Sequence, residues 1–524
     1  MKKTRENYFW LWILVGLAAL SFRLLLIYYS YWHHHYLVPP GNDVVNHWWK
    51  IQSILQHGWA GLSGYPPGFH LLVIGISRLF HQPIWTILTS WTPFLLILPA
   101  FSIFFLLKQV FSLRISVLAS AILLITSFYP VLAFTDGNYP DILAYGVFGV
   151  LLFAFLIRYF KTNHYINLIL AGVFLVLIAF THHLTFFGIL GVLVIFGLWQ
   201  FFKRLARSQR SVTTKILMGT GILLLLTALF FILANILYGG VAMQFIRGIS
   251  QITGSAYLKI TPDYGNYPEM SGGLLWFFGL AGLLYILVTT FSQREKAKTK
   301  ELVIIWILLF FALSRMNSSG IPSRFAREVA LPLTIAIAFL LEYLIELNPW
   351  RTRFGQILAY ALIGYLLITN SALYAGLGRI PDGFADQIWY LPIDQQKIDY
   401  LAESCPGGTL LYNPSADPFF TIKARNTLIP LDLSSSEKSV VKVYLNSPDR
   451  ESSQADFKAL IRDLKVKYQS ADCLFDDVKP PGNTSPVYPI FSDFEVNKAV
   501  LDNLATYGRE TKVFEDTAKV YQMK

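Results

Sequence analysis

Cysteine and charge are both scarce in this 524-residue chain. There are two cysteines, Cys405 and Cys473, and no CxxC or Cys/His pattern that would predict a metal site. Charged residues make up 14% of the chain, whereas a soluble globular protein carries about a quarter. The low charge excludes an ordinary soluble domain for most of the sequence.

Apolar residues are correspondingly frequent. Hydrophobic residues make up 54% of the chain, and its mean hydropathy is +0.48. Long apolar stretches recur over residues 1–374, which is typical of helices that cross a membrane. Residues 375–524 are charged, contain many Pro, Gly and Ser, and have no such stretch. The pattern predicts a polytopic α-helical membrane domain over 1–374 and a soluble domain over 375–524.

The basic residues argue for a lipid bilayer as partner and against nucleic acid. The net charge is +11, but the Lys and Arg residues stand in short clusters between apolar segments. That is where the positive-inside rule places them.

The first apolar run predicts an uncleaved helix. It follows a basic "MKKTR" start and resumes after Arg23 with no small-residue cleavage site. From segment lengths and flanking charges we expect about eleven helices in the plasma membrane. The N-terminus is then cytoplasmic and the C-terminal domain extracytoplasmic. This count takes "NHWWKIQSILQHGW" and "YPPGFHLLVIGISRLF" as interfacial helices; if the second spans, the parity reverses.

Polar clusters fall in the predicted outer loops. "GNYPD" at 137–141 and "GNYPE" at 265–269 each precede an apolar run. We interpret both as helix starts, with Pro at the first helical position and an acid facing the helix dipole. Asp141 fits that role, so Asp136 is the stronger functional candidate in "TDGNYPD". In "THHLT", His182 and His183 point different ways on a helix, so at most one is expected to face a site.

Asp43 opens the stretch "NDVVNHWWK" in the first outer loop. Asn42 or Asp43 can cap the helix that follows. Alternatively, Asp43 is a carboxylate held at the membrane surface for general-base work.

Asp43, the amphipathic helix after it and "YPPGFHLL" together resemble the GT-C superfamily of membrane glycosyltransferases, in its bacterial and archaeal branches. Weaker echoes are "TDGNYPD", "THHLT" and "PSRFAREVALPL". The resemblance implies transfer of a sugar from a polyprenyl-phosphate-linked donor to a glycan, lipid or protein acceptor on the outer face. It implies that Asp43 is catalytic and takes the proton of the acceptor or orients it. Val44 follows where relatives can have an acidic pair, so a divalent-cation cofactor is left open and no metal ligands are assigned.

The leaving lipid phosphate needs a cation. Arg324 and Arg327 lie three residues apart, on one face of a helix, in the one basic loop that breaks the positive-inside pattern. Arg315 is in the same loop. The alternative partners of these arginines are Glu328 and lipid headgroups. The predicted substrate-binding residues are Asp136, Asp141, His182, His183, Tyr65, Glu269, Arg324 and Arg327.

Two other functions stay open. One is a transporter or flippase of lipid-linked glycans, which predicts polar residues near the bilayer midplane. The other is a non-catalytic relative that binds lipid-linked glycans. The clustering of polar residues at one interface favours the glycosyltransferase.

The C-terminal segment predicts a small α/β or α+β domain. We expect strands in "GGTLLYNP" and "LKVKYQSAD", a hairpin in "TKVFEDTAKVYQMK", and a Ser-capped helix in "SQADFKALIRDL". No Gly-rich phosphate loop or nucleophile motif occurs there, so no catalysis is assigned to it. Cys405 and Cys473 are equally compatible with a disulfide and with two free thiols.

Overall fold

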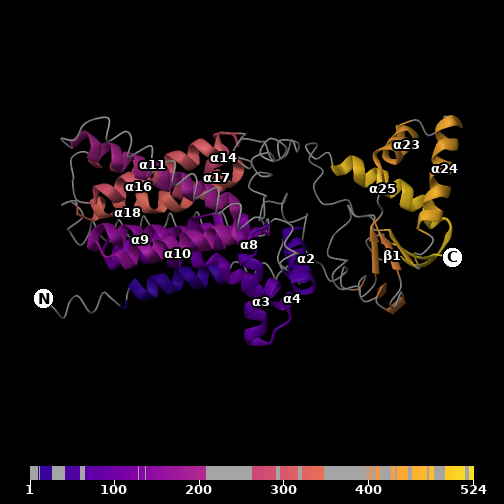
Figure 1. The fold of residues 1–524 in the computed structure, drawn as a ribbon, viewed down its shortest axis with the longest axis horizontal. Helices are drawn as coiled ribbons and strands as arrows, with labels where there is room; N and C mark the ends of the chain where they lie inside the picture. Colours follow the sequence, from indigo (N-terminus) through magenta and orange to yellow (C-terminus); the bar gives the residue numbers. More distant parts are fainter. Residues whose placement is uncertain are drawn as a thin grey trace. The chain divides into compact units, whose positions relative to one another are not determined.

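The structure is a computed structural model (Figure 1). Apart from a few single residues, it describes the following ranges: 12–25, 42–58, 65–127, 129–135, 137–207, 262–290, 296–316, 322–346, 409–412, 427–430, 433–446, 451–468, 473–476, 490–513 and 519–523. The chain forms two compact units, one of residues 1–29 and 47–377 and the other of residues 30–46 and 378–524. The predicted boundary at residue 374 lies outside the described ranges and stays a prediction.

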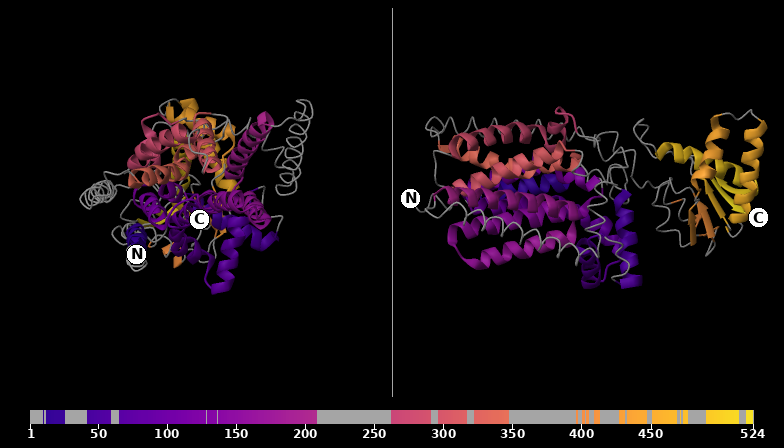
Figure 2. Two further views of the ribbon diagram at one scale, coloured as in Figure 1. Left: turned by 90° about the vertical axis from the view of Figure 1, so that its left-hand side faces the viewer. Right: turned by 45° about the horizontal axis from the view of Figure 1, so that its top comes forward.

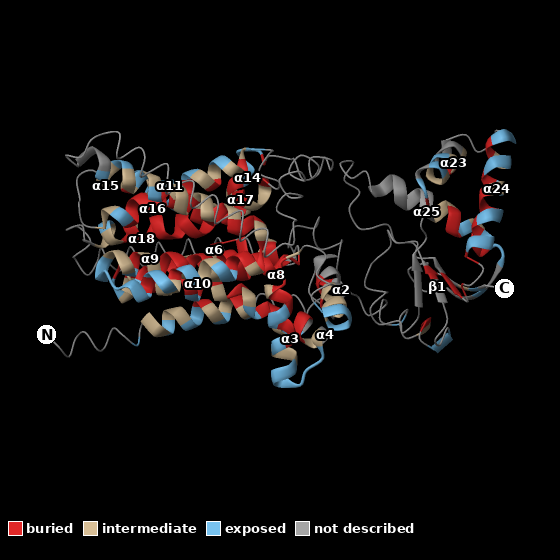
Figure 3. Ribbon diagram, in the orientation of Figure 1, coloured by how far each residue is buried: buried red, intermediate tan, exposed pale blue. Residues whose placement is uncertain are grey.

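The first unit is a bundle of apolar helices that run side by side (Figure 1). Their buried faces meet in the middle of the bundle, as Figure 3 shows for α9, α16 and α18. The bounds of the long helices are α5 Leu98–Lys108, α6 Leu113–Thr126, α9 Val150–Thr162, α10 Tyr165–Thr181, α11 His183–Arg207, α15 Gly273–Thr290, α16 Ala297–Ser314 and α18 Ala330–Glu346.

Four helical segments among the described residues are long and apolar enough to cross a membrane. They are Tyr139–Thr162, His183–Arg204, Gly273–Thr290 and Pro322–Ile345. Five shorter apolar helices accompany them. These segments agree with a membrane protein, and the count of about eleven spans stays a prediction.

Two glycines bring α15 and α18 into close contact. A Cβ atom on Gly282 would lie 2.4 Å from the carbonyl oxygen of Ala336, and one on Gly279 would lie 2.7 Å from Cβ of Leu333. Small residues allow helix backbones to approach this closely in a membrane. The two glycines therefore fix how α15 packs on α18.

Short elements gather at one end of the bundle. Figure 2 shows α3 running across that end. The elements are α2 Asn42–His57, α3 Gly68–Phe80, α4 Ile84–Thr86, η2 Ile87–Trp91, η3 Thr92–Leu96, α7 Tyr129–Thr135, α8 Tyr139–Asp141, η4 Ile142–Gly149, α14 Asn266–Ser271 and α17 Pro322–Glu328. The two predicted interfacial segments are helical (α2 and α3), and α3, at 13 residues, is too short to span.

The two copies of the repeated phrase both start helices, but neither places Pro at the first helical position as predicted. The helices begin at Tyr139 and at Asn266 instead. The amide groups of a whole first turn lack helical partners, so Pro is tolerated beyond its first residue. The first copy continues through the π-helix η4 into α9. The second ends at Ser271, before Gly272 with a φ of 102°.

The described residues of the C-terminal unit form a five-stranded mixed sheet of order β2-β1-β3-β5-β4. Strand β1 is parallel to β2 and β3, whereas β5 is antiparallel to β3 and β4. The apolar faces of the helices pack with β1 and β3 in one core. The strands are β1 Thr409–Tyr412, β2 Thr427–Pro430, β3 Cys473–Asp476, β4 Gly508–Val513 and β5 Lys519–Met523, and the helices are α23 Ser435–Asn446, α24 Glu451–Lys467 and α25 Ile490–Ala505.

Two of the predicted strand segments are confirmed and one is wrong. Strand β1 lies in "GGTLLYNP", and β4 and β5 pair as the predicted hairpin. The first residues of "LKVKYQSAD", Leu464–Lys467, instead form the end of helix α24. Leu464 and Tyr468 are buried at helical spacing, while Val466 is 66% exposed. The predicted Ser cap is also wrong, since α24 begins at Glu451 and Ser453 is a buried residue inside it.

Cys473 is disulfide-bonded. The other cysteine of the sequence lies outside the described residues. A disulfide is typical of an oxidising compartment, which agrees with the predicted extracytoplasmic location of this domain.

Candidate functional site

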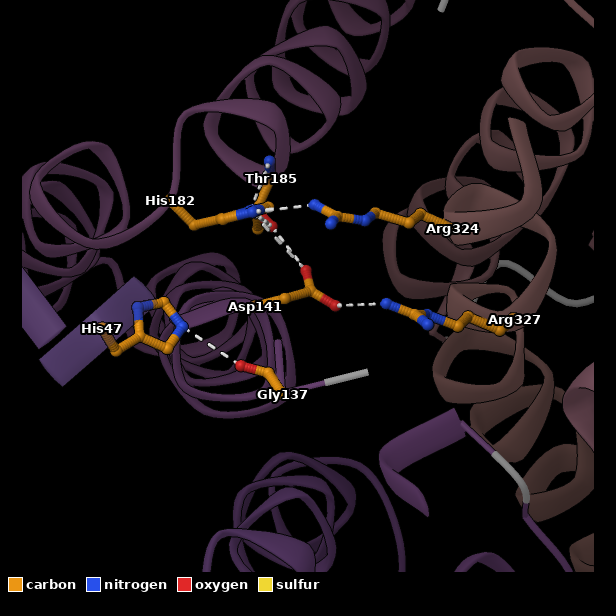
Figure 4. Close-up of polar contacts among 7 residues, drawn as sticks. All are labelled: His47, Gly137, Asp141, His182, Thr185, Arg324 and Arg327. Atoms are coloured by element: carbon orange, nitrogen blue, oxygen red, sulfur yellow. Dashed lines mark hydrogen bonds and ion pairs between the residues drawn. The ribbon is translucent and has the colours of Figure 1, made fainter. Parts of the chain in front are cut away.

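Polar side chains from three parts of the bundle meet at the end where α8 begins (Figure 4). Asp141 comes from α8, His182 and Thr185 from the junction of α10 with α11, and Arg324 and Arg327 from α17. Three of the apolar segments, Tyr139–Thr162, His183–Arg204 and Pro322–Ile345, start here. Helix N-termini carry partial positive charge and favour anions. The cluster is therefore a focus of positive potential as well as of polar groups.

Asp141 is fully buried in the cluster. Its Oδ1 accepts a hydrogen bond of 2.9 Å from the Thr185 hydroxyl, and its Oδ2 lies 3.8 Å from Nη2 of Arg327. The carboxyl group of Glu328 is a further electrostatic neighbour. Burial of a carboxylate is costly unless it is paired and hydrogen-bonded, so the contacts with Thr185 and Arg327 account for its position.

His182 is 1% exposed and joins Asp141 to Arg324. Its Nε2 lies 3.2 Å from Nη1 of Arg324, and its Nδ1 lies 2.8 Å from the Thr185 hydroxyl oxygen. The Thr185 backbone N–H also points at Nδ1, at 3.3 Å. A guanidinium group only donates hydrogen bonds, so we assign Nε2 as an acceptor and place the single ring hydrogen on Nδ1. This choice keeps the bond of Nδ1 with the Thr185 hydroxyl and gives up the longer contact with the Thr185 amide. The chain then runs from Arg324 to His182 Nε2, from His182 Nδ1 to Thr185, and from Thr185 to Asp141.

This assignment makes His182 a neutral imidazole. Burial is the main cause that holds the pKa of His182 well below its ordinary value of 6.5, and the positive charge of Arg324 is the second. A neutral His182 keeps one lone pair, on Nε2, and Arg324 occupies it.

Asn138 holds the two arginines together. It is 2% exposed. With its amide oxygen turned toward them, that oxygen accepts from Arg324 Nε at 3.2 Å and from Arg327 Nη2 at 3.0 Å. Both guanidinium groups are thereby fixed on the same side of Asp141.

A second layer of rings lies beside the cluster. His47 of α2 has its Nδ1 3.1 Å from Nε2 of His70 and its Nε2 3.1 Å from the carbonyl oxygen of Gly137. Burial, reinforced by the charge of Lys50, lowers the pKa of His47 to about 3. The ammonium group of Lys50 lies over the ring of Tyr65, 3.5 Å from the ring centre.

The structure brings together four of the predicted site residues, Asp141, His182, Arg324 and Arg327. Two more adjoin them, since the rings of Tyr65 and His183 meet at 5.9 Å, and His183 is next to His182 in sequence.

Other candidates fall elsewhere. Glu269 is an exposed residue of α14, and none of the described contacts of the cluster involves it. Arg315 instead donates to the carbonyl of Pro262. The side chain of Asp43, and Asp136 as a whole, lie outside the described residues, so their roles stay predictions. Among the described residues, no group of three or more His, Cys, Asp or Glu side chains is placed to hold a metal ion.

Sequence reasoning missed Thr185, Asn138 and His47 as members of the site. A signal existed for Thr185, which follows His182 by three residues at a helix start, where hydroxyl side chains bond to neighbouring polar groups. No local signal marks Asn138 or His47, because their partners are distant in the sequence.

No known protein-family profile matches the chain, and no curated protein matches it in sequence. Solved structures of the oligosaccharyltransferase AglB from the archaeon Archaeoglobus fulgidus do match its fold. The complex with an inhibitory peptide and a dolichol-phosphate has a TM-score of 0.58 at 13% identity, over 99% of this chain and 74% of that one. The form tethered to an acceptor peptide with the NVT sequon has a TM-score of 0.59 at 12% identity, over 99% of this chain and 75% of that one.

The complex of the same enzyme with Zn and sulfate gives a TM-score of 0.57 at 14% identity, over 98% of this chain and 72% of that one. The chain thus has the fold of this archaeal membrane enzyme. The fold resemblance stated from the sequence is confirmed.

Proposed function

We propose that this protein is a membrane glycosyltransferase that moves a sugar from a polyprenyl-phosphate-linked donor to an acceptor at the extracytoplasmic face. One observation carries the proposal. Arg324 and Arg327 are held side by side by Asn138, at the point where three apolar helices begin. Paired guanidinium groups and helix N-termini suit a phosphate group, and the fold is that of membrane glycosyltransferases.

The chemistry needs a place for charge to collect. As the bond between the sugar and the phosphate breaks, negative charge builds on the phosphate oxygens. Arg324, half-buried at the edge of the cluster, and Arg327, behind it, are placed to stabilise that charge. Asp43, in the first outer loop, is the proposed catalytic carboxylate, which takes the proton of the acceptor or orients it.

The comparison structures suggest the kinds of partner. The archaeal enzyme was solved with a dolichol-phosphate and with acceptor peptides. A lipid-borne phosphate is therefore the proposed donor scaffold here. The acceptor class, whether glycan, lipid or protein, is to be found by assay, and so is the need for a divalent cation.

The proposed topology places the N-terminus in the cytoplasm and the C-terminal domain outside, with about eleven spans. The disulfide at Cys473 supports an oxidising location for that domain.

The test is transfer of radiolabelled sugar from polyprenyl-phosphate donors by the purified protein in vesicles, with and without a chelator. Asp43→Asn should lower transfer by about 100-fold or more, whether the carboxylate takes the proton of the acceptor or orients the acceptor. Asp456→Asn, on an exposed face of α24, is the matched control and should transfer normally.

A normal rate for Asp43→Asn would show the catalytic assignment to be wrong. Movement of labelled lipid-linked glycan across sealed vesicles without transfer would show a transporter instead. Donor binding without turnover would show a non-catalytic binding protein.

A further inference from the structure

The hydrogen-bond chain through His182 leaves one reactive atom. In the assigned tautomer, Nδ1 donates to the Thr185 hydroxyl, and that hydroxyl donates to Asp141, so these contacts hold the ring in one orientation. The remaining nitrogen, Nε2, has a lone pair. An oriented neutral imidazole of this kind is the usual general base of enzymes.

Arg324 covers that lone pair. Its Nη1 lies 3.2 Å from Nε2. Arg324 is half-buried, whereas His182 is 1% exposed. Anything that reaches His182 from this side must first displace the guanidinium group. A neutral imidazole is a weaker partner for a guanidinium cation than a phosphate group, because the phosphate carries opposite charge and accepts two parallel hydrogen bonds from the guanidinium.

We propose that His182 is the base that removes the proton of the acceptor, and that Arg324 covers it until the phosphate of the donor draws Arg324 away. This rests on the proposed function and assigns Asp43 the orienting role. Thr185 and Asp141 are positioning residues. The order of events follows, since the base becomes available only when a donor phosphate is bound.

The step balances. The acceptor O–H or N–H gives its proton to Nε2 of His182, and its freed electron pair forms the bond to the anomeric carbon. The bond from that carbon to the phosphate oxygen breaks, and its electron pair stays on the phosphate, beside Arg324. His182 is left as an imidazolium with Nδ1–H still bonded to Thr185, and it later releases the proton to water.

The charges around His182 support the sequence of events. It faces Asp141 from α8, Arg324 and Arg327 from α17, His183 from α11 and His47 from α2. Arg324 is the largest charged cause of the lowered pKa of His182. When Arg324 pairs with phosphate, that cause is neutralised, and the imidazole becomes a stronger base at the moment it is uncovered.

Acylation by diethyl pyrocarbonate tests the cover without any turnover, because the reagent attacks an unprotonated, accessible imidazole nitrogen. The full-length protein is labelled alone, with farnesyl phosphate, with farnesol and with inorganic phosphate, and tandem mass spectra separate His182 from His183. Farnesyl phosphate should raise labelling of His182 about tenfold, the effect of freeing one hydrogen bond to a charged group. Exposed His164 is the internal control.

In the Arg324→Ala variant, diethyl pyrocarbonate should acylate His182 fast even with no ligand present. An equal response to inorganic phosphate would support the cover and show that the lipid is not needed. Unchanged labelling of His182 in all four conditions and in Arg324→Ala would overturn the proposal. These outcomes do not depend on transfer, so they stand apart from a failure of the proposed function.

Two substitutions of Thr185 test its positioning role in the transfer assay. Thr185→Ser keeps the hydroxyl, whereas Thr185→Val keeps the shape and loses it. The Val variant should have kcat reduced by about 10- to 100-fold with KM unchanged, a partial loss of general-base catalysis, and the Ser variant should be near normal. In the wild type, protonation of His182 should lower the transfer rate at low pH. The residual transfer rate of His182→Gln should not show that fall. A Val variant with normal kcat would overturn the chain from His182 to Asp141.

Discussion

The imidazole of His47 donates from Nε2 to the carbonyl oxygen of Gly137 across 3.1 Å. His47 stands on α2, and Gly137 has a φ of 70° in the turn before α8. Left-handed backbone of this kind favours glycine. The bond therefore fixes α2 against the turn that precedes Asn138 and Asp141, two members of the site.

The first prediction concerns pH. The pKa of His47 is about 3 in the folded protein, against about 6.5 in an unfolded chain. Since the folded state prefers neutral His47, its contribution is complete above pH 6.5 and is lost as the pH falls from 6.5 toward 3. At pH 5 the loss is about 2 kcal/mol. Thermal unfolding in detergent at pH 7.5 and pH 5 measures it.

His47→Gln is the control, because an amide can donate to the same carbonyl and does not titrate. Its drop in melting temperature between the two pH values should be smaller than that of the wild type. Equal drops would show that His47 does not charge on unfolding.

The second prediction concerns Asp141 and Arg327, whose charged groups lie 3.8 Å apart in a buried setting. Arg327→Met should destabilise the protein by about 3 kcal/mol, because removal of one partner leaves a buried charge uncompensated. Adding Asp141→Asn to that variant should recover part of the loss. Thermal unfolding of both single variants and the double variant measures the coupling, and strictly additive effects would contradict it.

The third prediction concerns the contact of α15 with α18. Gly282→Ala should cost about 1–3 kcal/mol, because the new methyl group would overlap the Ala336 carbonyl. Gly172→Ala in α10 is the matched control, since nothing lies within 4 Å of its Cβ position. That variant should be neutral or slightly more stable, as Ala is the better helix former. Equal melting temperatures for the two variants would argue against a close contact at Gly282.

The fourth prediction concerns the start of α23. The Glu437 amide donates to the Ser434 hydroxyl at 3.3 Å, and the Glu437 carboxylate accepts from the Ser434 amide, which is a capping box. Ser434→Ala should cost about 1 kcal/mol, and hydrogen exchange in the first turn of α23 should become faster. Exposed Ser439→Ala is the control.

The same pair gives a pH dependence. Hydrogen bonding by Ser434 lowers the pKa of Glu437 below its ordinary value of 4.5. Its contribution is therefore present above pH 4.5 and is lost as the pH falls below that value. Exchange in the first turn of α23 should be faster in acid for the wild type but not for Glu437→Gln.

Apolar periodicity and turn residues were enough to predict the helices α2 and α3 and the β4–β5 hairpin. They failed at the start of "LKVKYQSAD", Leu464–Lys467, which is helical although its alternation of apolar and basic residues fits a strand locally. The core of the domain decides instead, because Leu464 and Tyr468 reach it only from a helix, with Val466 turned outward. Local pattern does not contain that information.

At the site, the sequence supplied Arg324, Arg327, His182 and Asp141, but it ranked Asp141 below Asp136, whose role stays a prediction. An acid in the first turn of a helix has an ordinary explanation, and only the fold shows that Thr185, 44 residues away, bonds to it. Such partners depend on how helices pack, which a single sequence does not specify.

The π-helix η4, Ile142–Gly149, follows Asp141 directly. A π-helical turn holds an extra residue compared with an α-helical one, and each residue of an α-helix turns the chain by about 100°. The direction in which Asp141 faces, relative to the rest of its helix, is thus set by the number of residues in the segment as well as by their identity. Deleting a single apolar residue there would rotate Asp141 away from Thr185, although every polar residue of the site would still be present in the sequence.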